Sequence, residues 1–105
     1  MISVCVIYPR TERSRFDMDY YVKKHMPMTM KSLGSALKGV TVEAGATGAE
    51  PGSPPANAAV CRLLFDSVEA FLAAFGPNAA KIQGDIPNYT DVAPVIQINE
   101  VRISK

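Results

Sequence analysis

His25 is the single histidine of this 105-residue chain and the side chain best suited to acid or base chemistry. An unperturbed imidazole changes its charge near neutral pH, which no other side chain does unaided. Tyr21 precedes it by four residues, and side chains at this spacing lie on one face of a helix. We therefore predict His25 as a general acid or base, with Tyr21 as a second catalytic residue that orients it or binds substrate oxygen.

A structural role for His25 is the alternative. An imidazole on an apolar helix face is often neutral, with its nitrogens satisfied by backbone groups or by a tyrosine hydroxyl. Pro27 has no amide hydrogen for the carbonyl of Lys23 and crowds that turn, so the helix is expected to bend or break near His25. Because a broken turn exposes backbone polar groups, the catalytic role and the structural role both stay open.

Further polar candidates stand before the last expected strand, at Asp85, Asn88 and Tyr89. Such residues form turns, but they can also close over a cleft. We predict Tyr89 and Asn88 as substrate contacts and give Asp85 less weight. Tyr20 is included as a substrate contact, although consecutive helical residues point about 100° apart, so that Tyr21 is favoured for the side of His25.

No metal or cofactor is predicted. Cys5 and Cys61 lie in two separate apolar runs and are expected to be buried free thiols. A single histidine and two separated cysteines cannot supply the four ligands of a structural zinc site. The glycines at 45, 48 and 52 do not stand between a strand and a helix, so nucleotide-dependent chemistry is not expected.

Charge and hydropathy narrow the choice of partners. The net charge of +1 gives no electrostatic reason for binding nucleic acid or an anionic membrane. No apolar stretch approaches the roughly 20 residues that span a bilayer. The first ten residues lack the leading charge and the cleavage site of a signal peptide. We therefore expect a cytoplasmic protein whose partner is a small neutral ligand.

The hydrophobic pattern predicts the order strand, helix, strand, strand, helix, strand. Strands are expected over residues 2–8, 38–47, 58–65 and 92–103. Asp17 is the expected N-cap of the first helix and Gly34 its end. Asp66 is the expected start of the second helix, and Gly84 is expected to close its extension in a left-handed conformation. Right-handed crossovers then place both helices on one face of a four-stranded antiparallel sheet, in a single ferredoxin-like α+β domain over residues 1–105.

The first and last expected strands carry apolar side chains on both faces, whereas two helices can cover only one. The uncovered face therefore needs another layer, and a second copy of the chain is the simplest cover. A symmetric homodimer would hide this surface and would help a domain of marginal size.

Two segments of the chain resemble the EthD family, which is named for ethyl tert-butyl ether degradation. The first is the run over residues 16–27, with Tyr20, Tyr21, His25 and Pro27. The second is the run Asp85, Ile86, Pro87, Asn88 and Tyr89 together with the strand that follows it. The resemblance covers the chain from Ile2 to Val101, and residues 48–57 match least.

The resemblance implies a cytoplasmic dimeric α+β barrel that works beside catabolic or oxidative enzymes. It favours an accessory protein that binds a small hydrophobic or aromatic catabolic intermediate for an oxidative degradation pathway. The alternative is a cofactor-free enzyme of the isomerase, lyase or monooxygenase type, with His25 as general acid or base. Haem-binding members of the wider superfamily are not carried over, because the context of a haem ligand is absent from this sequence.

Overall fold

Four strands form one antiparallel sheet in the order β2-β3-β1-β4. A computed structural model describes all residues, 1–105, with β1 at Ile2–Pro9, β2 at Gly39–Ala44, β3 at Asn57–Phe65 and β4 at Val95–Glu100. β1 lies in the middle, where Val4 stands opposite Leu63 of β3 and Ile98 of β4. The predicted order of elements, the antiparallel sheet and the ferredoxin-like arrangement are confirmed.

The last strand is shorter than the predicted range of 92–103. Glu100 pairs with Ile2, and the amide of Val101 bonds to the carbonyl of Met1 at 3.2 Å, so β1 offers no further partner beyond this point. Pro94, just before the strand, has no amide hydrogen to contribute to a ladder. Pairing therefore limits β4 at one end and proline limits it at the other.

The first helical segment runs from Met18 to Leu33 in three parts: α1 at Met18–Tyr20, the π turn η1 at Tyr21–His25 and α2 at Met26–Leu33. Asp17 is its N-cap as predicted, because Oδ1 accepts a bond from the Tyr20 amide at 3.1 Å. Gly34 ends it with a φ of 62°, a conformation that glycine adopts without strain.

The irregularity predicted beside Pro27 is present as a π turn, and the helix continues past it. The amide of Met26 bonds to the carbonyl of Tyr21, five residues earlier. Pro27 follows directly as the second residue of α2, where it has no amide hydrogen to bond to the turn before it. The π turn thus accommodates the proline and carries both Tyr21 and His25.

The second helical segment bends, with α3 at Val68–Phe75, the 3₁₀ turn η3 at Gly76–Asn78, α4 at Ala79–Gly84 and the 3₁₀ turn η4 at Ile86–Asn88. Its N-cap is Ser67 and not Asp66, since the Ser67 hydroxyl accepts a bond from the Ala70 amide at 3.1 Å. The left-handed Gly84 was also a wrong prediction, because only Gly34 and Gly52 have positive φ. The chain instead continues through Asp85 into η4.

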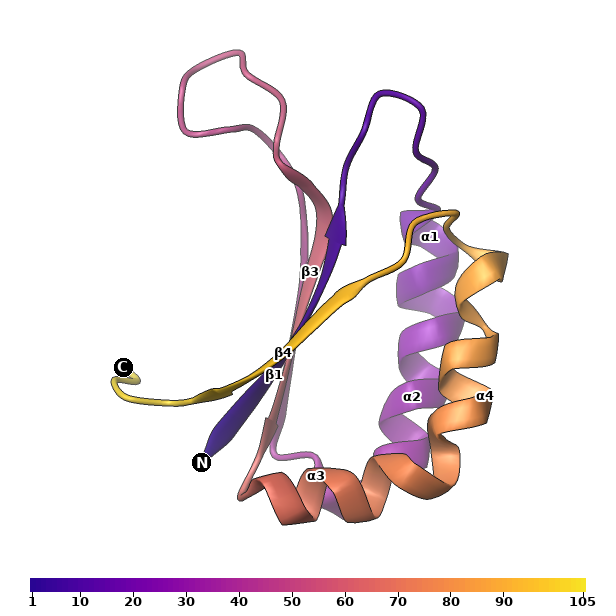
Figure 1. The fold of residues 1–105 in the computed structure, drawn as a ribbon, viewed down its shortest axis with the longest axis vertical. Coiled ribbons are helices and arrows are strands. Elements are labelled where there is room, and N and C mark those ends of the chain that lie inside the picture. Colours follow the sequence, from indigo (N-terminus) through magenta and orange to yellow (C-terminus); the bar gives the residue numbers. More distant parts are fainter.

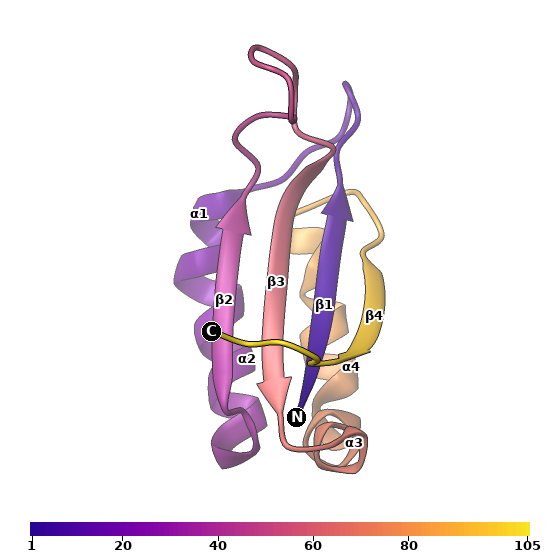
Figure 2. The ribbon, with the colours of Figure 1, turned by 90° about the vertical axis from the view of Figure 1, so that its left-hand side faces the viewer.

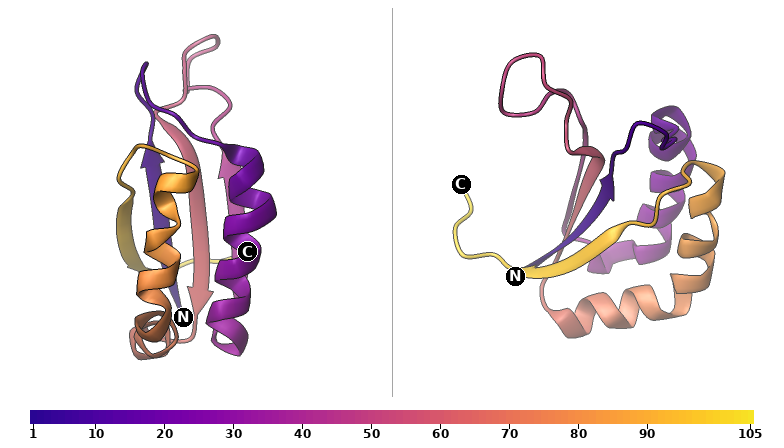
Figure 3. Two further views of the ribbon diagram at one scale, coloured as in Figure 1. Left: turned by 90° about the vertical axis from the view of Figure 1, so that its right-hand side faces the viewer. Right: turned by 45° about the horizontal axis from the view of Figure 1, so that its top comes forward.

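Both helical segments cover the same face of the sheet (Figures 1 and 3), and Figure 2 shows the opposite face without a helix. The core lies between these layers and includes Val4, Tyr8, Cys61 and Phe65, each at most 2% exposed. Residues 101–105 leave the sheet on its uncovered side (Figure 1), and Ile103 in this segment is 92% exposed. None of the helices has the length and apolar character that a membrane crossing requires.

Candidate functional site

His25 and Asp85 form a hydrogen-bonded pair between the two helical segments. His25 Nδ1 lies 2.9 Å from Asp85 Oδ2, and the two residues are 60 positions apart in the chain. His25 comes from the π turn η1, while Asp85 stands at the junction of α4 and η4. The side chains are 5% and 16% exposed, so the pair is largely shielded from solvent.

Asp85 is held by two further donors on its outer side. The hydroxyl of Tyr20 donates to Oδ1 at 2.7 Å, and the side-chain amide of Asn88 donates to the same oxygen at 2.8 Å. A carboxylate that accepts several bonds is favoured in its ionised form. The outer side of the pair is therefore polar, fully bonded and fixed in orientation.

The pKa values of the pair indicate a neutral imidazole beside an ionised carboxylate. Burial lowers the pKa of His25 below its ordinary 6.5, and this outweighs the opposing influence of Asp85. Burial alone would raise the pKa of Asp85, but hydrogen bonds from Asn88, Tyr20 and His25 outweigh it, so that the pKa falls below 3.8. With Asp85 as an acceptor, Nδ1 of a neutral His25 carries the hydrogen, which leaves Nε2 with a lone pair that can accept from the Tyr89 hydroxyl.

Two tyrosines, Tyr21 and Tyr89, contact the imidazole, and a third, Tyr8, bonds to Tyr89. The Tyr21 ring stacks on that of His25, with centroids 5.3 Å apart and planes at 15°. The hydroxyl of Tyr89 lies 3.5 Å from His25 Nε2 and 2.6 Å from the hydroxyl of Tyr8. A row of polar atoms thus leads from Nε2 through Tyr89 to Tyr8.

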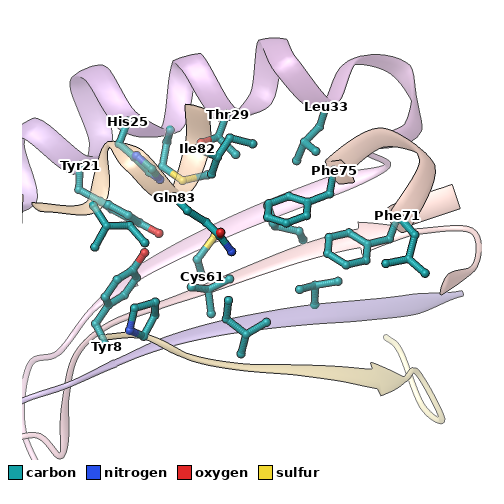
Figure 4. Close-up of a pocket in the computed structure, with 18 residues that line it drawn as sticks. Tyr8, Tyr21, His25, Thr29, Leu33, Cys61, Phe71, Phe75, Ile82 and Gln83 are labelled. Carbon is teal, nitrogen blue, oxygen red and sulfur yellow. The ribbon is translucent and has the colours of Figure 1, made fainter. Parts of the chain in front are cut away.

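A cavity of about 250 Å³ lies between the sheet and the helices, and His25, Tyr21 and Tyr8 are in its wall (Figure 4). Of its 18 lining residues 14 are hydrophobic, and His25 is the only one that ionises near neutral pH. Leu72 of α3 and Ile96 of β4 line it while 55% and 49% exposed, so the cavity reaches the surface between these two elements. The cavity wall therefore suits an apolar ligand.

Besides His25 and Gln83, the wall contains the hydroxyl of Thr29 and the thiol of Cys61. Thr29 is 4% exposed, and its Oγ1 is buried without any hydrogen-bond partner. An unsatisfied buried hydroxyl costs about 1–3 kcal/mol. Cys61 is 1% exposed, and burial is the main cause that raises the pKa of its thiol to about 11. Cys61 is therefore a protonated part of the wall, not a nucleophile.

The structure brings the predicted site residues together but gives them different places. His25 and Tyr21 line the cavity, whereas Tyr89 is fully buried and not in its wall. Tyr20 and Asn88 lie on the outer side, where they border a surface depression with Asp85. No three histidine, cysteine, aspartate or glutamate side chains are grouped so that they could hold a metal ion.

Sequence reasoning passed over Tyr8 and Thr29 and gave too little weight to Asp85. Tyr8 was treated only as a strand residue, and Thr29 stands among methionines. The sequence shows that Asp85 stands near a helix end, but its pairing with His25 depends on packing between two distant segments. Only the fold reveals that pairing.

Comparisons with known proteins agree with this architecture. The family model of the EthD domain matches residues 9–93. The crystal structure of an EthD-like protein from Ralstonia eutropha JMP134 is 51% identical, with a TM-score of 0.94, over 99% of this chain and 94% of that one. An ethyl tert-butyl ether degradation (EthD) family protein from Bacillus halodurans C-125 is 20% identical, with a TM-score of 0.64, over 96% of this chain and 98% of that one, and it shows the fold alone. No curated protein matches. The resemblance noted in the sequence is confirmed, and the chain belongs to the EthD family.

Proposed function

We propose that this protein binds a small, mostly apolar metabolite in the cavity and that His25 transfers a proton on it as a general base. The observation that carries this proposal is the pairing of His25 Nδ1 with Asp85, in the wall of an otherwise apolar cavity. A histidine with a structural role alone does not need a carboxylate fixed by two other donors. Perturbed ionisable groups at the edge of an apolar pocket are typical of catalytic sites.

The proton transfer would use the lone pair of Nε2, to which the substrate presents its proton in place of the Tyr89 hydroxyl at 3.5 Å. The substrate gives up a proton from carbon or oxygen, and the resulting imidazolium is stabilised by the ionised Asp85. The electron pair of the broken bond stays on the substrate, and the proton returns to another of its atoms. Such a sequence isomerises or cleaves the substrate without an oxidant. The hydroxyls of Tyr89 and Tyr8 extend the hydrogen-bonded row from Nε2 to the cavity wall.

A non-catalytic role as an accessory to oxidative degradation is the second candidate. It is favoured by the apolar character of the wall, with 14 hydrophobic residues of 18, which suits retention of a hydrophobic intermediate. Membership of a family named for ether degradation points the same way. In this role His25 and Asp85 would hold the helices together, and the bound molecule would leave unchanged.

A base-sensitive probe separates the two candidates without knowledge of the natural substrate. 1,2-Benzisoxazole is neutral and small, and removal of its ring C–H proton breaks the N–O bond to give 2-cyanophenol, which is detected by its absorbance. We expect saturable elimination by the protein, with loss in His25→Gln and retention in Lys23→Gln, an exposed position of the same turn. Equal rates for the protein and His25→Gln would remove the catalytic proposal.

We also propose a cytoplasmic homodimer in which a second copy covers the open face of the sheet. Ile7 and its partner Val95 lie on this face, and Val95 is 53% exposed. Residues 101–105 project from the same side with Ile103 exposed, so a twofold partner would meet both surfaces. Sedimentation should show dimers that Val95→Lys weakens and that Val22→Lys, on the helical side, leaves intact. A single subunit at high concentration would contradict this.

A further inference from the structure

The Thr29 hydroxyl is the one buried side-chain oxygen or nitrogen without a partner in this structure. A threonine inside a helix often bonds the carbonyl four residues earlier, which here belongs to His25, but no such bond is present. Thr29 instead lines the cavity, and Figure 4 shows it on the same helix as His25, one turn further along. No protein group satisfies this hydroxyl, so a molecule in the cavity, ligand or water, is the partner that the structure leaves for it.

The rest of the wall restricts what that partner can be. No lysine, arginine, aspartate or glutamate lines the cavity. An anionic or cationic ligand would lose its hydration there without a compensating charge, which is strongly unfavourable. A ligand with no polar atom would leave the Thr29 hydroxyl unsatisfied. Gln83 also lines the cavity, but it is exposed, so its amide can bond to water. The wall therefore fits an uncharged molecule that brings one oxygen to Thr29.

The volume sets the size of that molecule. A cavity of about 150 Å³ lined by apolar side chains binds benzene, so a cavity of about 250 Å³ takes about ten non-hydrogen atoms by proportion. This is the size of a benzene ring with a short side chain. The exposed Leu72 and Ile96 at the opening leave room for a slightly longer apolar substituent.

We propose that Thr29 is the specificity-determining residue of the cavity, and that it anchors the carbonyl or hydroxyl oxygen of an uncharged, single-ring ligand one helical turn from His25. This inference rests on the proposed function insofar as both need the cavity to bind a ligand. A carbonyl bonded to Thr29 would have its acidic neighbouring C–H group close to the imidazole. Thr29 would thus select substrates on which a base can act.

Binding of matched probes tests the assignment. Ethylbenzene, 1-phenylethanol, acetophenone and benzoate share a ring but differ in oxygen and charge, and their dissociation constants are measured by titration of backbone amide signals. Thr29→Val keeps the shape and removes the hydroxyl, while Thr29→Ser keeps the hydroxyl. For Thr29→Val we expect acetophenone and 1-phenylethanol to bind about three- to tenfold more weakly, with ethylbenzene bound at least as well as before.

Two further results are expected. Thr29→Ser should bind acetophenone and 1-phenylethanol about as tightly as the original protein does. None of the three proteins should bind benzoate. Thr29→Val should also melt at a higher temperature in the absence of probe, because an unsatisfied buried hydroxyl has been removed. This readout shows that any lost binding does not arise from a damaged fold.

The contrary outcomes separate the two proposals. Unchanged binding of acetophenone by Thr29→Val would overturn the role of Thr29, since a water molecule would then serve the hydroxyl. Equal weakening for ethylbenzene and acetophenone would also overturn it, because the effect would come from packing. Failure of every probe to bind the original protein would overturn both proposals. Probe binding without base-catalysed elimination would overturn only the catalytic role of His25.

Discussion

The two sides of the His25 ring differ sharply. On the outer side, Nδ1 bonds to Oδ2 of Asp85, whose Oδ1 accepts bonds from Tyr20 and Asn88. On the other side, Nε2 has only the Tyr89 hydroxyl at 3.5 Å, and Thr29, which lines the cavity together with His25, has no partner at all. The comparison indicates that the outer side fixes the imidazole, whereas the cavity side is left incomplete for a ligand. Buried polar groups are rarely left without a partner, and a ligand in the cavity is the partner that we propose for Thr29.

His25→Gln removes the imidazole and both of its nitrogens, so it should have the largest effect on the elimination rate. A positioned general base contributes about 10²- to 10⁴-fold to a rate, so benzisoxazole elimination should fall by that factor. Probe binding should be affected far less, because the wall is mostly apolar. Rates at saturating probe measure the first effect and titrations the second. Loss of binding with an unchanged saturated rate would reverse this account of His25.

Asp85→Asn removes the charge on the outer side only and should have the next largest effect. Asparagine can present either its oxygen or its amide to Nδ1, so the ring is no longer held in one tautomer. We expect a loss of about 10- to 100-fold, the range known for partners that orient metal-bound histidines. The pKa of His25 should also fall further, because Asp85 acts to raise it. NMR titration of the imidazole measures this, and a rise of the pKa would contradict the assignment.

The pH dependence of the free energy of unfolding tests the protonation states of His25 and Asp85, with a smaller expected effect. Because burial lowers the pKa of His25, the unfolded chain takes up a proton near pH 6.5 that the folded chain excludes. The free energy of unfolding should therefore fall as the pH is lowered from about 6.5 toward the folded pKa. Below pH 3.8 the lowered pKa of Asp85 should add a second loss.

Urea denaturation over a pH series checks this prediction. His25→Gln should lack the first decrease and keep the loss below pH 3.8. A protein that becomes more stable as the pH falls through 6.5 would show that the pKa of His25 is raised in the folded state. That result would make an imidazolium, not a neutral base, the species in the cavity wall.

Removal of one outer donor should have the smallest effect. In Tyr20→Phe, Asp85 keeps its bonds to Asn88 and His25, and in Asn88→Ala it keeps those to Tyr20 and His25. Each variant should therefore lose less than about tenfold in elimination rate, since one net hydrogen bond contributes about 0.5–1.5 kcal/mol. Combining the two replacements should approach the effect of Asp85→Asn. A single replacement as severe as Asp85→Asn would mean that Tyr20 or Asn88 takes part in the reaction directly.

The sequence predicted most helices and strands, because these elements depend on interactions between residues that are close in the chain. The alternation of β1, the cap at Asp17 and the glycine at 34 each depend on neighbours in the chain. Two of the errors are also local, and the first is the cap: Asp66 and Ser67 are both good caps, and only the backbone geometry chooses Ser67. Gly84 was assigned a left-handed conformation that the continuing turn into η4 does not need.

The site was less predictable, since it depends on contacts between distant segments. His25 and Tyr21 could be singled out because one helical turn joins them. Asp85 could not be paired with His25, and Tyr8 could not be joined to Tyr89, because 60 and 81 residues separate them. Thr29 carries no signal in the sequence, and its importance lies in a missing partner that only three-dimensional packing reveals.

The tautomer of His25 is the most direct test of the central claim. Nitrogen-15 NMR distinguishes a nitrogen that carries hydrogen from one with a lone pair, and the single histidine makes assignment unambiguous. At pH 7 we predict a neutral ring with hydrogen on Nδ1 and a lone pair on Nε2. Hydrogen on Nε2, or on both nitrogens, would contradict the claim that Asp85 fixes His25 as a base toward the cavity.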